Sequence, residues 1–133
     1  MQPNGLHAYR KTEVQSRTPL ELVVMLYDGA LRFIGVAKDA IGRGDIRGRS
    51  EAISRALAII SELQSTLDIE RGGDMAASLD DMYRYITQCV VQATVKNDAA
   101  PLDEARRLLE TLRDGWQQIA ANAAATAPIG VRR

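Results

Sequence analysis

The side chains that most often perform catalysis or bind metals are scarce in this sequence. Its 133 residues include one histidine, His7, and one cysteine, Cys89. A helical phosphotransfer domain needs an exposed histidine within a helix, and a di-iron bundle needs Glu-x-x-His pairs on facing helices. His7 precedes every helix predicted below. Cys89 has no histidine near it in the sequence, so we expect it to be a small buried side chain.

Two glycine-containing stretches invite comparison with phosphate-binding loops. The stretches "GRGD" (42–45) and "ERGGD" (70–74) lack both the spacing and the lysine of such a loop. Both are typical of turns between helices. The sequence therefore predicts no enzyme, no catalytic residue, no metal ligand and no cofactor.

Composition limits the partners and the compartment. The 17 basic and 17 acidic side chains balance, so no strong nonspecific attraction to nucleic acid is expected. No apolar run approaches the roughly 20 residues that span a bilayer, and the first residues lack the apolar stretch of a signal peptide. A single cysteine fits a reducing compartment. These features predict a cytoplasmic protein that binds no nucleic acid and does not insert into membranes.

Four segments have the apolar periodicity of helices. The first begins at Thr18, a capping residue followed by Pro19 and by Glu21, which completes a capping box, and it runs to about Arg43. The second spans about 46–67 and the third follows "ERGGD", with Asp74 as its expected cap. The fourth starts near Pro101 and has an apolar stripe made of Leu102, Ala105, Leu109, Leu112, Trp116 and Ile119.

Short turns between helices of similar length force neighbouring helices to be antiparallel. The predicted fold is all-α, an antiparallel up-down-up-down four-helix bundle over residues 18–121. Residues 1–17 are predicted to be a flexible segment packed on the bundle, and residues 122–133 a disordered tail.

The first helix is more apolar than one buried face requires. Its apolar arc covers more than half of the circumference, whereas a helix with one buried face needs a stripe of roughly 100°. Contact with two neighbouring helices explains part of the excess. An excess of this kind also marks a site for a partner. The candidate partner-binding residues, including the N-terminal tyrosine and two valines off the third helix's stripe, are Tyr9, Leu22, Met25, Leu26, Gly29, Val91 and Val95.

Three blocks of this sequence resemble the FliS family of flagellar export chaperones. The stretch "AYRKTEVQSRTPLELVVMLYDGALRF" (8–33) has the family's early tyrosine, its Ser/Thr-x-Pro cap and its Met-Leu-Tyr-Asp-Gly-Ala core. The stretches at 52–86 and 102–118 are similar to its middle helices and to its closing helix with a late tryptophan. The similarity spans residue 8 to about residue 119. The glycine-rich first turn and the alanine-rich tail depart from the family pattern.

The resemblance implies a cytosolic, non-enzymatic bundle that binds the disordered C-terminal region of flagellin. Such a chaperone prevents premature polymerisation and presents flagellin to the export gate of the flagellar type III system. It also implies that Tyr9 serves the client groove or the gate, while Tyr27 is expected in the core and Asp28 exposed or bonded to a neighbouring helix.

Several alternatives stay open at this point. Residues 1–17 could shield the groove or anchor the client through Tyr9, and a homodimer is possible when the client is absent. The alternative function is a non-enzymatic helical adaptor or regulatory bundle that recognises a folded partner.

Overall fold

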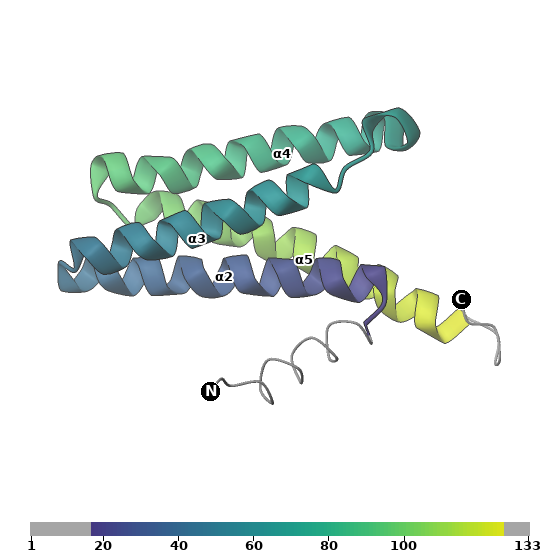
Figure 1. Ribbon diagram of the computed structural model, residues 1–133, viewed down its shortest axis with the longest axis horizontal. Coiled ribbons are helices and arrows are strands. Elements are labelled where there is room, and N and C mark those ends of the chain that lie inside the picture. Colours follow the sequence, from purple (N-terminus) through teal and green to yellow (C-terminus); the bar gives the residue numbers. More distant parts are fainter. Residues whose placement is uncertain (1–16, 127–133) are drawn as a thin grey trace, which may run out of the picture.

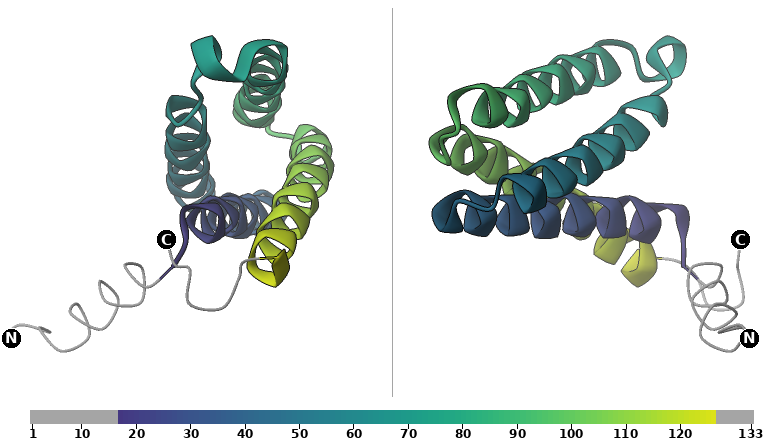
Figure 2. Two further views of the ribbon diagram at one scale, coloured as in Figure 1. Left: turned by 90° about the vertical axis from the view of Figure 1, so that its right-hand side faces the viewer. Right: turned by 60° about the vertical axis from the view of Figure 1, so that its left-hand side comes forward.

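The computed structural model describes residues 17–126 of the chain, with side chains described up to residue 123. This part contains four helices and no strand: α2 (Pro19–Arg43), α3 (Ile46–Ser65), α4 (Ile69–Lys96) and α5 (Ala100–Thr126). Successive helices run in opposite directions (Figure 1) and occupy the four corners of a bundle in the order α2, α3, α4, α5 (Figure 2). α5 packs against α2 and closes the bundle. The predicted all-α, up-down-up-down bundle is confirmed.

The start of α2 is capped as the sequence predicts. The Thr18 hydroxyl accepts a hydrogen bond from the Glu21 backbone N–H at 3.1 Å, and the Glu21 carboxylate accepts one from the Thr18 N–H at 2.9 Å. Pro19 occupies the first helical position, where its missing N–H costs nothing. The helix ends at Arg43, and Gly44 follows it in the left-handed conformation with φ 72°.

The predicted start of the third helix is wrong. α4 begins at Ile69, and its cap is Asp68, whose side chain accepts a hydrogen bond from the Arg71 N–H at 3.1 Å. The helix is interrupted at Gly73, where φ 56° and ψ −134° form a combination that is essentially restricted to glycine. "ERGGD" is therefore a first helical turn followed by a kink, because Asp68 caps earlier than Asp74 and only one of the two glycines leaves the helical conformation.

The other helix boundaries lie close to their predicted positions. α4 ends at Lys96 with Asn97 in the left-handed conformation, and Pro101 is the second residue of α5. α5 continues to Thr126, beyond the predicted end of the bundle at residue 121. Residues 1–16, which include His7 and Tyr9, and residues 127–133 lie outside the described part of the chain.

The core is almost entirely aliphatic. Tyr27 is fully buried, as expected, and Cys89 is buried within the same cluster. Asp28 is exposed and accepts a hydrogen bond from Arg113 Nε at 2.8 Å, which joins α2 to α5 as predicted. Ile119 of the predicted apolar stripe is instead exposed, and so is Ile46, the first residue of α3.

Replacing Gly35 with alanine is expected to stabilise the protein by about 0.5–1 kcal/mol, because glycine within a helix loses more backbone entropy on folding than alanine does. A Cβ atom at Gly35 would meet no atom within 4 Å. Gly29→Ala is the matched control, since its Cβ would lie 3.1 Å from Ile59 Cδ1 and the gain should be smaller. Urea unfolding measures both changes. A lower midpoint for Gly35→Ala would contradict this prediction.

Candidate functional site

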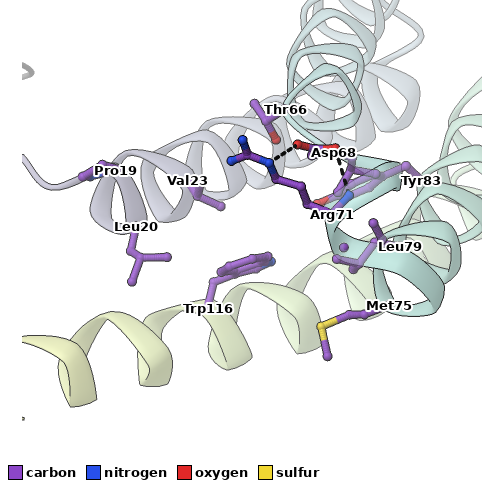
Figure 3. A pocket seen from close by; sticks show the side chains of 13 residues that line it. Pro19, Leu20, Val23, Thr66, Asp68, Arg71, Met75, Leu79, Tyr83 and Trp116 are labelled. Atoms are coloured by element: carbon purple, nitrogen blue, oxygen red, sulfur yellow. Dashed lines mark hydrogen bonds and ion pairs between the residues drawn. The ribbon is translucent and has the colours of Figure 1, made fainter.

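An apolar pocket of about 430 Å³ opens at the end of the bundle where α2 and α4 begin. Figure 3 shows side chains from three helices facing it, with Trp116 of α5 between the start of α2 and the start of α4. The residues of the α3–α4 turn and Arg71 form part of its rim, where Arg71 Nε lies 3.7 Å from an Asp68 carboxylate oxygen. The apolar residues that line it are Pro19, Leu20, Val23, Leu67, Met75, Ala76, Leu79 and Trp116.

The pocket exists because the bundle splays at this end. Figure 2 shows the α3–α4 turn standing away from the start of α2 and from α5. The kink at Gly73 sets the first turn of α4 at an angle to the rest of that helix, so this turn forms a wall of the pocket. Met75, just after the kink, is 75% exposed although it lines the pocket. The opening therefore exposes apolar surface.

A hydrogen-bonded aromatic trio, made of Tyr27, Tyr83 and Trp116, lies beside the pocket. Trp116 Nε1–H donates to the Tyr27 hydroxyl at 3.1 Å, and the hydroxyls of Tyr27 and Tyr83 share a hydrogen bond at 2.5 Å. Tyr83 and Trp116 line the pocket, whereas Tyr27 is covered by the core. Burial, the largest cause, raises the pKa of both phenols above its ordinary value of 10.0. Both phenols are therefore neutral at physiological pH.

Stability is expected to fall as the pH rises above 10, the ordinary phenol pKa. The unfolded chain releases phenolic protons that the folded chain retains, so the free energy of unfolding decreases by up to about 1.4 kcal/mol per pH unit for each phenol. In Tyr27→Phe the free energy of unfolding should decrease less steeply with pH, whatever the stability of this variant at pH 7. Melting temperatures between pH 9 and pH 11.5 measure the slopes. Equal slopes for wild type and Tyr27→Phe would rule out this linkage.

Of the predicted partner-binding residues, the six within the described residues 17–126 do not line this pocket. Leu22, Met25, Leu26 and Gly29 share one face of α2 by their helical spacing. Met25 is 37% exposed, Leu22 and Leu26 are partly buried, and the Ile59 side chain of α3 lies against Gly29. α3 thus lies close to Gly29. The four residues form a surface along α2, which we call the α2 face.

Val91 and Val95 form a separate exposed pair on α4. Val95 is 72% exposed and Val91 is 40% exposed, in agreement with their position off the apolar stripe. Val91 follows the pocket residue Ala76 by 15 residues, which is about 22 Å along a helix. Since α2 and α4 occupy opposite corners of the bundle (Figure 2), the structure does not bring this pair together with the α2 face.

Three residues of the pocket were missed because sequence periodicity assigns them to the core. Leu79, Tyr83 and Trp116 lie on regular apolar stripes, and only the splay of the bundle exposes one side of them. The one available signal was the glycine pair at 72–73, which indicates an irregular backbone without showing what it borders.

The described part of the chain holds no grouping of three or more histidine, cysteine, aspartate or glutamate side chains suited to a metal ion. Among the helices of residues 17–126, none combines the length and apolar character needed to cross a membrane.

Comparison with known proteins identifies the family. Residues 2–123 match the family described as flagellar protein FliS. The chain is 39% identical over 115 residues to the flagellar secretion chaperone FliS of Bacillus subtilis, covering 86% of this chain and 85% of that protein. It is 34% identical over 125 residues to the flagellar secretion chaperone FliS of Salmonella typhimurium, covering 90% and 93%. The flagellar secretion chaperone FliS of Campylobacter jejuni is 34% identical to this chain, and the match covers 92% of this chain and 96% of that protein. Because the match extends over nearly the whole chain, this protein belongs to the FliS family of flagellar secretion chaperones.

Proposed function

We propose that this protein binds the disordered C-terminal region of flagellin, prevents its premature polymerisation and presents it to the flagellar type III export gate. The observation in the structure that supports this proposal best is the apolar pocket at the splayed end of the bundle. The relatives of this protein are named flagellar secretion chaperones, which supports a flagellar protein as the client. Since the client is met before export, the proposal places this action in the cytoplasm. It requires no chemical step, only burial of apolar surface.

The proposed client fills the pocket and then crosses other faces of the bundle. Apolar side chains at helical spacing are the usual anchors of a helix that binds in an apolar groove. A disordered client loses conformational entropy when it orders, and coupled folding typically buries about 1,000–3,000 Å². That area exceeds what one pocket offers. The α2 face and the Val91–Val95 pair are therefore proposed as further contact surfaces.

Residues 1–17 are proposed to cover part of the pocket when the client is absent, with Tyr9 contributing to client binding. Pro19 and Leu20 line the pocket, so the segment that precedes them is attached at its rim. Deleting residues 1–15 should leave the bundle folded, increase self-association to a homodimer and preserve or strengthen flagellin binding. Tyr9→Ala should weaken binding by about 1–3 kcal/mol if the tyrosine contacts the client. Equal affinity and equal self-association in wild type and both variants would exclude both roles.

Met75→Glu is expected to weaken binding of a flagellin C-terminal peptide by at least about tenfold, which is 1.4 kcal/mol. A carboxylate in the apolar pocket would lose its hydration when the client enters. Because Met75 is 75% exposed, the variant should fold normally. Met25→Glu and Val95→Glu test the α2 face and the α4 pair in the same way. Isothermal titration calorimetry compares the affinity of each variant for the peptide with that of the wild type.

Ile46→Glu is the matched control for this series. Ile46 is also an exposed apolar residue, and it lies at the α2–α3 turn, at the opposite end of the bundle from the pocket. Its replacement should leave the affinity unchanged. An equal loss in Ile46→Glu and Met75→Glu would indicate a general charge effect and contradict a specific pocket. A helical adaptor for a folded partner would instead retain flagellin binding when the C-terminal region of flagellin is deleted, or show none at all.

A further inference from the structure

The aromatic trio beside the pocket contains one more hydrogen-bond donor than it uses. Its members supply three donor hydrogens, one from the Trp116 indole and one from each phenol of Tyr27 and Tyr83. Two hydrogen bonds join the three groups, from Trp116 to Tyr27 and between the two hydroxyls. Burial raises the pKa of both phenols, so neither hydrogen is lost at physiological pH. One O–H group therefore has no acceptor within the trio.

Burial decides which of the two phenols keeps the unused hydrogen. If Tyr83 donated to Tyr27, the Tyr27 hydrogen would be left inside a fully covered core with no acceptor, which is a costly arrangement. If Tyr27 donates to Tyr83, the Tyr27 hydroxyl both accepts from Trp116 and donates to Tyr83, and it is satisfied. The unused hydrogen then belongs to Tyr83. Tyr83 lines the pocket, although it is only 2% exposed, whereas Tyr27 does not line it.

We propose that the Tyr83 hydroxyl donates a hydrogen bond to an uncharged acceptor of the client, the side-chain carboxamide of an asparagine or glutamine held among apolar anchors. This inference rests on the proposed function and adds that the client must place one polar acceptor in an apolar pocket. A carboxylate is a poor occupant because the lining is apolar and the nearby Arg71 already pairs with Asp68. The backbone carbonyls of a bound helix are already bonded within that helix. The oxygen of a side-chain carboxamide is uncharged and is not already bonded within the bound helix.

The chain contains a built-in reporter of pocket occupancy. Trp116 is its only tryptophan, and it lines the pocket. A bound peptide without tryptophan should exclude water from the indole and shift its emission to shorter wavelength. The titration of emission gives the affinity at the site itself, which a measurement of total binding does not.

The test compares Tyr83→Phe with Tyr27→Phe in titrations of a flagellin C-terminal peptide. Each variant loses one hydroxyl and the Tyr27–Tyr83 hydrogen bond, but only Tyr83→Phe removes a hydroxyl from a residue that lines the pocket. We expect Tyr83→Phe to weaken binding by about 3- to 10-fold, the scale of one hydrogen bond. We expect Tyr27→Phe to bind within about twofold of wild type, because Tyr83 keeps its donor.

A set of peptides identifies the acceptor. Each asparagine is replaced by leucine and each glutamine by methionine, one at a time. One replacement should weaken binding to wild type about 3- to 10-fold and have no further effect on Tyr83→Phe, as expected for two groups that contact each other. Equal affinities for wild type and Tyr83→Phe, or equal losses in Tyr83→Phe and Tyr27→Phe, would overturn the role of Tyr83 while leaving the proposed function intact. No peptide binding by wild type would overturn both.

Discussion

Replacing Trp116 with alanine is expected to lower the free energy of unfolding by about 3 kcal/mol, the lower end of the range for removing a large aromatic side chain from a core. The indole packs against the buried cluster and donates a hydrogen bond to Tyr27, but one side of it borders the pocket. Because that side is already open, the change removes less packing than it would in a closed core. The same change removes a wall of the pocket, so client binding should fall as well.

Trp116→Phe separates packing from hydrogen bonding at this position. Phenylalanine fills most of the indole's space but cannot donate to the Tyr27 hydroxyl, so the expected loss is about 1 kcal/mol. Urea unfolding followed by circular dichroism measures both variants, since neither retains tryptophan fluorescence. A wild-type midpoint for Trp116→Ala, together with lost client binding, would mean that this tryptophan serves the client alone.

Ile60→Ala is expected to cost about 2–5 kcal/mol of stability, because it leaves a cavity in a close-packed interior. Ile60 is fully buried in the second half of α3 and belongs to the cluster that all four helices share. The bundle is small and stability margins are typically only about 5–15 kcal/mol, so this loss should be visible as a large drop in melting temperature.

The neighbouring residue is the matched control for Ile60. Ile59 has the same side chain in the same helix, but it is only partly buried and lies against Gly29 at the α2 face. Ile59→Ala should cost clearly less than Ile60→Ala, because water or a neighbouring side chain can occupy the space that it leaves. Equal losses would show that the contact with Gly29 is as closely packed as the core.

Local features of the sequence were sufficient to predict the helices. Thr18, Pro19 and Glu21 satisfy the free backbone groups at the start of α2 with atoms only a few residues away, so the helix start can be read directly. The start of α4 was misplaced because two aspartates, Asp68 and Asp74, both precede suitable helical residues. The choice between them depends on which of the two adjacent glycines leaves the helical conformation, and the sequence does not show that it is Gly73.

The candidate site was much harder to predict because it depends on contacts across the bundle. Tyr27 and Trp116 are 89 residues apart, and nothing in their local sequences indicates that they form a hydrogen bond beside an opening. Val91 and Val95 are exposed, as their predicted position off the apolar stripe of the helix indicates, and Met25 is exposed as well. Whether these residues contact a client stays a prediction.

The closure of the bundle by α5 also determines when the pocket is complete during synthesis of the chain. The pairs α2–α3, α3–α4 and α4–α5 are neighbours in sequence, so they can associate early and fast. The contact of α2 with α5 joins the two ends of the domain, and both the Asp28–Arg113 ion pair and the wall provided by Trp116 depend on it. A chain still being translated can therefore build three helices without having a pocket. Under the proposed function, the pocket can hold a client only after the ribosome has released the last helix.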